Sequence, residues 1–326
     1  MTLLAPSAAR EVRHSGLPDR ESFWYFFDNR WQPMCAGRGR RPVMARQCTV
    51  PAVRDRKVAH GADPLVMLTA YDAPGARMVD QAGADLILVG DSVAMVVLGY
   101  DDTLQVTVDD IAHHTAAVVR TRPSALVVAD MPWMSYHVSV EDTVRNAASL
   151  VRAGAQAVKL EGGRRRLPMV EALIAAEIPV MGHLGLTPQS VHAMGGFKVQ
   201  GRDAQAAFDL VDASKALAHA GCFAIVLEGV PSLVAAMVTE AVDVPTIGIG
   251  AGPDCDGQVL VFHDVLGLEH RVAPKFVRRY ADLHSVGVDA MSAFAADVRS
   301  GAFPSVDEGY RMADDEVAAL GLYGAA

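Results

Sequence analysis

Short apolar runs in this sequence repeatedly end in an ionisable side chain, and these side chains are the first candidates for chemistry. The residues at the run ends are Asp72, Asp91, Asp130, Lys159 with Glu161, His183 and Glu228. If the runs are parallel strands of one barrel, their carboxyl ends point into a single mouth. Burying so many charges in one cavity is costly unless they are paired or bind a metal. The pattern therefore predicts a charged, functional mouth.

Two of the carboxylates, Asp91 and Asp130, are the best candidates for direct metal ligands, because they follow adjacent runs at matching positions. Carboxylates without a cluster of Cys or His residues favour a hard cation such as Mg²⁺. Glu161 follows the next run and completes the ligand set directly or through water, since Mg²⁺ keeps several waters. Ser92 can donate a hydrogen bond to a bound oxygen.

The remaining charged residues suit a small anionic substrate and a proton transfer. Lys159 alternates with Glu161 along one run, so both face the barrel interior, where a lysine needs an anionic partner. We expect Lys159 and His183 to contact a substrate carboxylate. Glu228 comes from across the barrel, opposite the metal pair, which suits a general base.

Structural roles compete with these functional ones. Asp72 precedes Ala73 and Pro74, and an N-cap of the following helix is given equal weight there. A single histidine such as His183 is more often structural when it stands alone. A single charge at a strand end is often only a solvated ion pair.

The elements that must position these side chains alternate regularly from residue 65 onward. Apolar, β-branched runs cover 65–72, 86–91, 126–132, 157–162, 180–185, 224–229 and 246–251. Helical patterns fall near 75–83, 109–121, 140–153, 168–176, 203–220 and 232–242. Continuous apolar character is typical of parallel strands that are covered on both faces.

This alternation predicts a closed (β/α)8 TIM barrel. Seven βα units are visible, and no G-x-G-x-x-G turn of a doubly wound fold follows the first run. The eighth strand must lie between about 257 and 280, where 260–265 and 275–279 compete. A helix over 289–299 with Gly301 as its C-cap, and a short helix near 314–320, are expected after the barrel.

Composition limits the classes of protein to consider. The chain has 326 residues and a formal net charge of -9, with no basic stripe in its main body, so nucleic acid is not an expected partner. No apolar run reaches the roughly 18 residues of a membrane-spanning helix. The four cysteines, Cys35, Cys48, Cys222 and Cys255, show no C-x-x-C spacing, and their sparse use fits a reducing cytoplasm. Cys222 lies in an apolar stretch and is expected to be buried and inert.

Three regions are expected along the chain. Residues 1–47 have many arginines and no clear period, which indicates an extension outside the fold, either a targeting peptide or a start assigned upstream of Met44. Residues 48–304 are expected to form the catalytic barrel, and residues 305–326 a tail that contains the short helix.

Several long motifs resemble one family, the ketopantoate hydroxymethyltransferases. They are Gly90-Asp91-Ser92, Val97–Tyr100, Asp130-Met131-Pro132, Lys159–Gly163, Gly182–Gln189, Phe197–Arg202 and Gly248–Gly257. The resemblance runs from about residue 48 to about residue 304, in one order and without large gaps. Because several motifs are long and unusual, a chance match is not expected.

The resemblance implies a TIM barrel of the phosphoenolpyruvate/pyruvate type. It implies transfer of the one-carbon unit of 5,10-methylenetetrahydrofolate to 3-methyl-2-oxobutanoate through a metal-stabilised enolate, giving 2-dehydropantoate for pantothenate and coenzyme A synthesis. The family's Mg²⁺ ligands fall on Asp91 and Asp130, with Glu161 nearby through water. The substrate-binding positions fall on Asp91, Ser92, Asp130, Lys159 and His183, and the proton acceptor falls on Glu228. Family members form large homo-oligomers, commonly decamers.

Four positions depart from the family pattern without removing a functional group. Ala94 and Met134 stand where glycine is usual, Gln105 replaces a proline, and Gly229 replaces a bulkier residue. Two other functions stay open. A lyase of the isocitrate lyase type would have a catalytic cysteine in a loop at the mouth, and no convincing candidate exists. A metabolite-binding barrel without activity would not need both a metal pair and an opposed base.

Overall fold

The computed structural model describes residues 47–270 and 274–320, and within them eight strands form a closed barrel. The strands are β1 (Leu65–Thr69), β2 (Leu86–Val89), β3 (Leu126–Asp130), β4 (Ala157–Glu161), β5 (Val180–Gly185), β6 (Ala224–Glu228), β7 (Thr246–Ile249) and β8 (Gly257–Leu260). Every neighbouring pair is parallel, and the order in space is the order along the chain, from β1 to β8 and back to β1. The predicted (β/α)8 architecture is confirmed.

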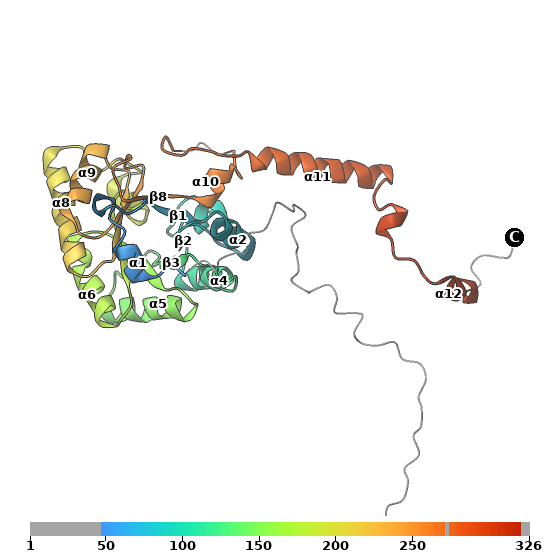
Figure 1. Cartoon of the computed structure of the whole chain (residues 1–326), viewed down its shortest axis with the longest axis horizontal. Helices are drawn as coiled ribbons and strands as arrows, with labels where there is room; N and C mark the ends of the chain where they lie inside the picture. Colours follow the sequence, from blue (N-terminus) through green and yellow to red (C-terminus); the bar gives the residue numbers. More distant parts are fainter. Residues whose placement is uncertain (1–46, 271–273, 321–326) are drawn as a thin grey trace, which may run out of the picture. The chain divides into compact units, whose positions relative to one another are not determined.

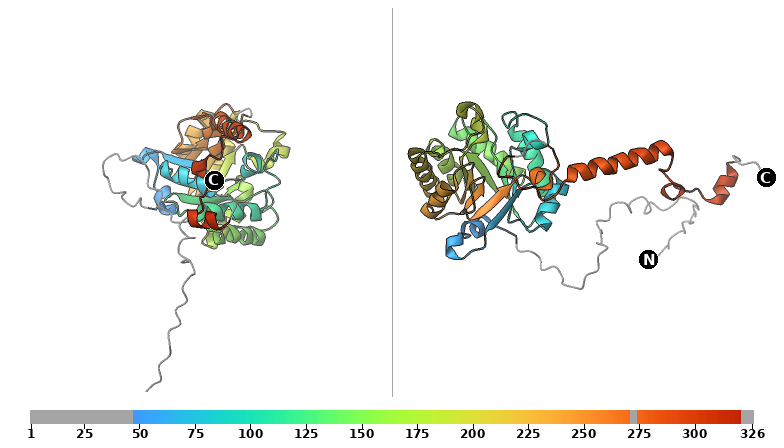
Figure 2. Two further views of the ribbon diagram at one scale, coloured as in Figure 1. Left: turned by 90° about the vertical axis from the view of Figure 1, so that its right-hand side faces the viewer. Right: turned by 90° about the horizontal axis from the view of Figure 1, so that it is seen from above.

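Helices surround the strands (Figures 1 and 2). The main ones are α2 (Ala73–Gln81), α4 (Val108–Val119), α5 (Val140–Arg152), α6 (Leu167–Ala175), α8 (Ala204–His219) and α9 (Ser232–Ala241). Short helices α3 (Val93–Val96), α7 (Val191–Met194) and α10 (Phe262–Leu266) follow β2, β5 and β8. Several main helices begin where the sequence supplies an N-cap, for example Thr107, Ser139 and Asp203, whose side chains accept a backbone N–H three residues later.

The closing strand is the one element that the sequence misplaces. Neither 260–265 nor 275–279 forms β8, which covers Gly257–Leu260 instead. This strand lacks a continuous apolar run, because it contains a glycine and Gln258 beside Val259. Gly257 is needed there: a Cβ at this position would lie 2.6 Å from Cβ of Leu65, its partner in β1. Close approach of two strands thus replaces the hydrophobic signal.

Alternation along the strands divides the barrel interior into two layers. Inward-facing apolar residues fill the amino-terminal half, among them Met67, Leu88, Val128, Met181 and Val226. The next inward position along a strand is two residues further on, which in β3, β4, β5 and β6 gives Asp130, Lys159, His183 and Glu228. The charged mouth therefore rests on a packed apolar floor.

The amino-terminal end of the barrel is closed by the chain before β1. Helix α1 (Val50–Arg54) buries Val53 completely against the inner apolar residues. Lys57 precedes the turn η2 (Val58–His60), and its buried ammonium lies 2.8 Å from Oδ2 of the buried Asp256, just before β8. This ion pair ties the start of the chain to the closing strand.

After the barrel, the chain forms α11 (Leu283–Ser300), which begins six residues before the predicted helix and buries none of its residues. Gly301 ends it at φ 76°, as expected of a C-cap, and the predicted short helix is α12 (Asp314–Ala319). The predicted extension lies, apart from residue 47, outside the described residues.

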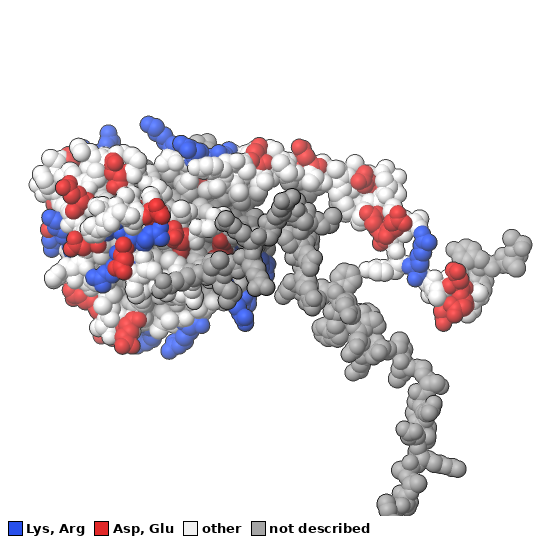
Figure 3. Space-filling view, in the orientation of Figure 1, with Lys and Arg blue, Asp and Glu red and all other residues white. Residues whose placement is uncertain are grey.

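Two surface observations complete the fold. Among the described residues, no helix is both long and apolar enough to span a membrane. On the face shown in Figure 3, acidic and basic side chains of the barrel are interspersed rather than gathered by sign.

Candidate active site

A cavity of about 840 Å³ opens at the carboxyl ends of the strands, and it gathers all the predicted site residues. Its lining includes Asp91, Ser92, Asp130, Lys159, Glu161, His183 and Glu228. Asp72 is not in this lining, because its Oδ1 accepts a hydrogen bond from the backbone of Gly75 at 2.7 Å and caps α2. For Asp72 the structural role is therefore the one observed.

Register between strands brings the charged residues side by side. Asp130 of β3 is paired with Lys159 of β4, and Glu161 of β4 with His183 of β5. Lys159 and Glu161 are two residues apart in β4, so both face the interior and the two pairs lie at successive inward positions of that strand.

The turn after β2 joins the first two candidate ligands directly. The backbone N–H of Asp91 donates to Oδ2 of Asp130 at 3.0 Å. Gly90 makes this approach feasible, because a Cβ there would lie 2.9 Å from Ser92 Oγ and 3.4 Å from Asp130 Oδ2. The Ser92 hydroxyl is 2.8 Å from the hydroxyl of the buried Tyr71. The motif Gly90-Asp91-Ser92 is thus a tight turn that sets the two carboxylates against each other.

Lys159 lies against a carboxylate of the protein itself. Its Nζ is 2.6 Å from Asp130 Oδ1, and both side chains are almost fully buried. Burial alone would lower the pKa of Lys159, but Asp130, Glu161 and Asp91 outweigh it and raise that pKa above its ordinary value. The ammonium group is therefore charged, close to both predicted metal ligands.

The pKa values of the two aspartates are raised by their surroundings. Burial, reinforced by the charge of Glu161, raises the pKa of Asp91 to about 6. Burial also raises the pKa of Asp130 to about 6, against the opposing effect of Lys159. Both shifts mean that the local environment disfavours the ionised carboxylates, a cost that a bound cation would remove.

His183 lies between two glutamates instead of standing alone. Its Nδ1 is 3.5 Å from Glu161 Oε1, and its Nε2 is 3.2 Å from Glu228 Oε2. Burial and the charge of Lys159 both lower the pKa of His183, but the two glutamates outweigh them and raise it to about 9. The predicted base, Glu228, therefore has a charged neighbour that the sequence had assigned only to the substrate.

The lining residues fit a divalent cation by charge and by donor type. Five carboxylates (Asp91, Asp130, Glu161, Glu228 and Asp264) line the cavity beside three lysines and one histidine, so acidic groups exceed basic ones. Among the described residues, no three His, Cys, Asp or Glu side chains stand close enough to form a complete metal cluster. Mg²⁺ does not require one, because one or two carboxylates, substrate oxygens and waters suffice.

The sequence analysis missed two buried polar residues beside these carboxylates, Gln189 and Tyr136. Gln189 Nε2 donates to Asp91 Oδ2 at 2.8 Å, and the Tyr136 hydroxyl donates to Gln189 Oε1 at 2.6 Å. Both are neutral residues in loops, and neither follows an apolar run directly. Their only signal was that Gln189 ends a motif shared with the family.

Two apolar segments with a lysine each form the outer rim of the cavity. One contains Phe197, Lys198 and Val199, and the other contains Pro274, Lys275 and Phe276. The backbone of Gln200 donates to the carbonyl of Gly229 at 2.9 Å, which anchors the first segment beside Glu228. The second is anchored by Phe276, whose Cδ1 lies 2.7 Å from where a Cβ on Gly250 would be. Both rim segments thus lie near the ends of β6 and β7.

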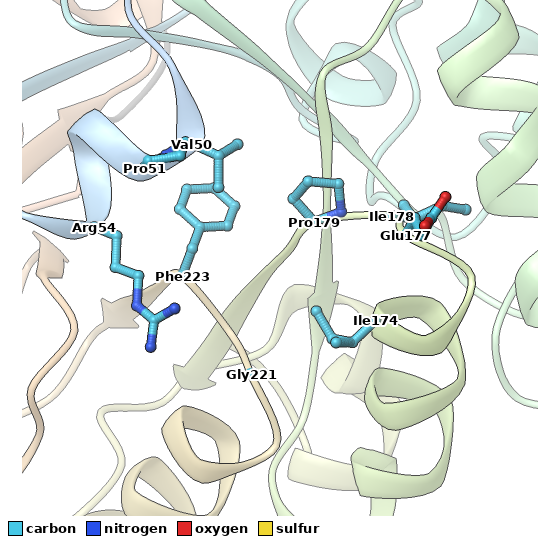
Figure 4. Close-up of a pocket in the computed structure, with 9 residues that line it drawn as sticks. All are labelled: Val50, Pro51, Arg54, Ile174, Glu177, Ile178, Pro179, Gly221 and Phe223. Carbon is cyan, nitrogen blue, oxygen red and sulfur yellow. The ribbon is translucent and has the colours of Figure 1, made fainter.

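A second, smaller hollow of about 300 Å³ lies at the opposite end of the barrel (Figure 4). It is lined mainly by apolar residues next to α1 and before β5 and β6, such as Val50, Pro179 and Phe223. Its ionisable residues are Arg54 and Glu177, with no candidate nucleophile or metal ligand pair. This hollow therefore offers no second candidate catalytic site among its described lining residues.

The cysteines argue against a lyase with a catalytic thiol. None of the described cysteines, Cys48, Cys222 and Cys255, lines the mouth cavity. Cys222 is buried as expected, and burial raises the pKa of its thiol to about 12.

Met134, one of the departures from the family pattern, has φ 67°, a left-handed conformation that explains why glycine is usual there.

Comparison with known proteins decides the family. The family model of ketopantoate hydroxymethyltransferase matches residues 47–306. The chain belongs to the ketopantoate hydroxymethyltransferase family. It is 56% identical over 278 residues to the 3-methyl-2-oxobutanoate hydroxymethyltransferase of Syntrophobacter fumaroxidans. The aligned residues cover 85% of this chain and 98% of that relative. It is 57% identical over 266 residues to 3-methyl-2-oxobutanoate hydroxymethyltransferase 2 of Bradyrhizobium diazoefficiens, covering 82% and 90%.

Solved structures place the ketopantoate hydroxymethyltransferase barrel among its fold relatives. Phosphonopyruvate hydrolase in complex with oxalate and Mg²⁺ matches with a TM-score of 0.54 at 16% identity, covering 83% of this chain and 94% of that one. 2,3-Dimethylmalate lyase, a member of the PEP mutase/isocitrate lyase superfamily, matches with a TM-score of 0.52 at 17% identity, covering 84% and 94%. These likenesses confirm the predicted barrel fold. The chain is an enzyme, as the motifs indicated.

Proposed function

We propose that this enzyme transfers the one-carbon unit of 5,10-methylenetetrahydrofolate to 3-methyl-2-oxobutanoate and produces 2-dehydropantoate, a step of pantothenate synthesis. One observation carries the proposal: in a chain of this family, a single cavity holds the pair Asp91 and Asp130 and, from a strand across the barrel, the more accessible Glu228. A cation held by the two aspartates would bind the anionic substrate. Glu228 would then face that substrate as a carboxylate able to take a proton from it.

The divalent cation would be held by Asp91 and Asp130, with Glu161 contributing through water. Their buried oxygen donors and raised pKa values support this assignment. When bound, a cation such as Mg²⁺ polarises the 2-oxo group of the substrate and makes its C3 proton more acidic. The superfamily relative solved with oxalate and Mg²⁺ is consistent with a divalent cation in this barrel type.

The oxo acid would be oriented by Ser92, Lys159 and His183. Ser92 is held by Tyr71 at the turn after β2, where its hydroxyl can donate to a substrate oxygen. Lys159 is charged and can shift part of its interaction from Asp130 to the substrate carboxylate. Because Lys159 and His183 are buried and all three side chains contact neighbours that hold them, they place the substrate with little rearrangement of the site.

Glu228 would remove the C3 proton. Its side chain is 17% exposed, more than the 2–4% of Asp130, Lys159 and His183, so it reaches furthest into the open cavity. His183 Nε2 lies 3.2 Å from Glu228 Oε2 and would help to position the carboxylate. The methylene carbon is bonded to two folate nitrogens, and one of these C–N bonds opens to give the iminium form that the carbanion at C3 attacks. The second C–N bond breaks when water supplies the hydroxyl oxygen. The two nitrogens take up the proton removed from C3 and one proton of the water, which gives tetrahydrofolate.

The folate would occupy the outer half of the cavity, between the two rim segments. Phe197 and Phe276 are 53% and 37% exposed, and their rings offer apolar surface to a planar heterocycle. Lys198 and Lys275 supply positive charge for the carboxylates of its glutamate tail. A volume of about 840 Å³ leaves room for such a co-substrate beside a small oxo acid.

A large homo-oligomer, the predicted partner state, has one supporting feature. Helix α11 exposes Val286, Met291 and Phe294 by 55–66%, and contiguous apolar side chains of this kind often mark subunit contacts. Light scattering of the purified enzyme tests this expectation, and a monomer at micromolar concentration would contradict it.

Proton exchange tests the function and the base separately. Wild-type enzyme with Mg²⁺ and 3-methyl-2-oxobutanoate in deuterated water should exchange the C3 proton without folate, and should form 2-dehydropantoate once the folate is added. Glu228→Gln should still bind the oxo acid but lose exchange by about 100-fold or more, the usual contribution of a positioned base. Glu171→Gln on the exposed face of α6 is the matched control and should exchange normally.

The outcomes separate cleanly. Wild-type exchange with full exchange in Glu228→Gln would remove Glu228 from its role but leave the function standing. A wild-type enzyme that forms no 2-dehydropantoate from both substrates would refute the function itself.

A further inference from the structure

Gln189 occupies the centre of a hydrogen-bond network beneath the proposed cation site. It lies in the turn η4 (Pro188–Ser190), directly after β5, and is only 5% exposed. Its side-chain nitrogen donates to Asp91 Oδ2 at 2.8 Å and to the carbonyl oxygen of Met131 at 3.0 Å. Its backbone N–H donates to Glu161 Oε2 at 3.1 Å. One residue thus contacts groups from the ends of β2, β3 and β4.

The orientation of the Gln189 amide is fixed by Tyr136. The Tyr136 hydroxyl donates to Gln189 Oε1 at 2.6 Å and accepts the backbone N–H of Glu161 at 3.2 Å. A flipped amide would present its NH₂ group to a hydroxyl that already accepts the Glu161 N–H, and its oxygen to the Asp91 carboxylate. With Oε1 and both N–H bonds used, Gln189 has no unsatisfied polar group and one stable orientation.

This arrangement decides which carboxylate oxygens remain available. On Asp91, Oδ2 is held by Gln189, while Oδ1 accepts no hydrogen bond from any described residue. On Glu161, Oε2 is held by the Gln189 backbone, while Oε1 lies 3.5 Å from His183. Each acidic side chain is therefore anchored through one oxygen and keeps the other for a ligand in the cavity.

We propose that Gln189 is a positioning residue for the cation site, which orients Asp91 and Glu161 together, and that Tyr136 orients Gln189 in turn. The inference rests on the proposed function, in which both carboxylates serve a divalent cation. Residues that hold metal ligands in place typically contribute about 10–100-fold to metal affinity or activity. The neutral amide does this without adding charge to a site already rich in carboxylates.

Calorimetric titration with Mg²⁺ tests the proposal. Gln189→Met keeps the length and approximate volume of the side chain but removes every hydrogen bond from it. We expect its Kd for Mg²⁺ to rise about 10–100-fold, with much of kcat recovered at saturating Mg²⁺. Tyr136→Phe keeps the ring and frees the amide to flip, and a rise of about threefold to tenfold is expected, below the full effect of a supporting residue.

The matched control is Gln205→Met on α8. Gln205 also donates to an aspartate, Asp209, at 2.9 Å, but this pair is exposed and does not line the mouth cavity. It should leave the Kd unchanged. A merely structural role for Gln189 would lower the Tm without moving the Kd, so both are measured.

Two results would overturn the inference. A folded Gln189→Met enzyme whose Mg²⁺ affinity stays within about twofold of wild type, below any effect expected of a supporting residue, would remove Gln189 from this role. If Gln189→Met does not fold, an unchanged Kd in Tyr136→Phe decides against the proposal. Wild-type enzyme that binds no Mg²⁺ with or without oxo acid would instead refute the cation site, and with it the basis of the inference.

Discussion

The two ends of this barrel each contain a buried lysine–aspartate pair, and the pairs have different surroundings. At the amino-terminal end, Lys57 lies 2.8 Å from Asp256, and at the mouth Lys159 lies 2.6 Å from Asp130. All four side chains are at most 5% exposed. Residue type, distance and burial are therefore nearly the same, and only the neighbours distinguish them.

At the amino-terminal end, every polar atom of the pair is occupied. Asp256 accepts from the backbones of Val58 and Thr246 as well as from Lys57, and Lys57 also donates to the carbonyl of Thr239. Neither the mouth cavity nor the smaller hollow is lined by Lys57 or Asp256. At the mouth, Lys159 and Asp130 line an open cavity beside further carboxylates. A saturated pair stabilises the fold, whereas an unsaturated one remains able to bind a ligand.

The largest expected effect is on stability, from Asp256→Ala. The substitution leaves Lys57 buried without its counter-ion and removes the acceptor of two backbone N–H groups. Breaking a buried pair in this way typically costs about 3–5 kcal/mol. Denaturant unfolding at fixed protein concentration measures the loss, and the kcat of the protein that remains folded should be close to wild type.

An exposed pair is the control for this prediction. Arg164 donates to Asp212 at 2.7 Å, with side chains 57% and 60% exposed, so Asp212→Ala should cost less than about 1 kcal/mol. If Asp256→Ala proved as mild as Asp212→Ala, the amino-terminal pair would not be the structural tie described above.

The mouth pair should respond in the opposite way to Asp130→Asn. The pKa of Asp130 is raised to about 6 by burial, so its ionised form opposes folding at neutral pH, and a neutral amide should stabilise the cation-free enzyme or leave it unchanged. Mg²⁺ affinity should fall by more than about 100-fold, beyond the range of residues that only support ligands. Calorimetry measures the affinity, and thermal melts without Mg²⁺ measure the stability.

The sign of the stability change follows from proton linkage. A carboxyl whose folded pKa lies above its unfolded value binds protons more tightly when folded, so its contribution to stability is lost as pH rises from about 4 to about 6. Asn does not titrate, so the gain of Asp130→Asn over wild type should be larger at pH 7 than at pH 4. A loss of stability at pH 7 with unchanged Mg²⁺ affinity would make the mouth pair structural, like the other.

The sequence predicted the strands and charged mouth residues because local pattern encodes both. Seven apolar runs mark β1 to β7, and alternation alone places Lys159 and Glu161 on the inner face. Strand β8 escaped because its signal is the close packing of Gly257 on Leu65, which depends on a residue nearly 200 positions away. A non-local steric requirement leaves no periodicity to read.

The pairs that the charged side chains of the mouth form with one another could not be predicted from the sequence, for a similar reason. Strand register decides whether Lys159 lies beside Asp130 or is left for a substrate. Register also places His183 between Glu161 and Glu228. Gln189 and Tyr136 are uncharged loop residues that become informative only when their hydrogen bonds converge on Asp91 and Glu161. The roles of the seven site residues stay predictions, to be decided by the variants above.

The smallest expected effect is on folate binding, from substitution of the two rim lysines. They extend the comparison from buried lysines to accessible ones. In the described residues, neither Lys198 nor Lys275 forms an ion pair, and both line the outer part of the cavity. Exposed pairs typically contribute about 0.2–1 kcal/mol, so Lys198→Gln and Lys275→Gln should each raise KM for methylenetetrahydrofolate about twofold to fivefold. Exchange of the C3 proton without folate and KM for the oxo acid should not change.

Because accessible charges are screened, the effect should shrink in high salt, unlike that of Asp130→Asn. Equal losses for folate and oxo acid would place these lysines outside the folate half of the mouth.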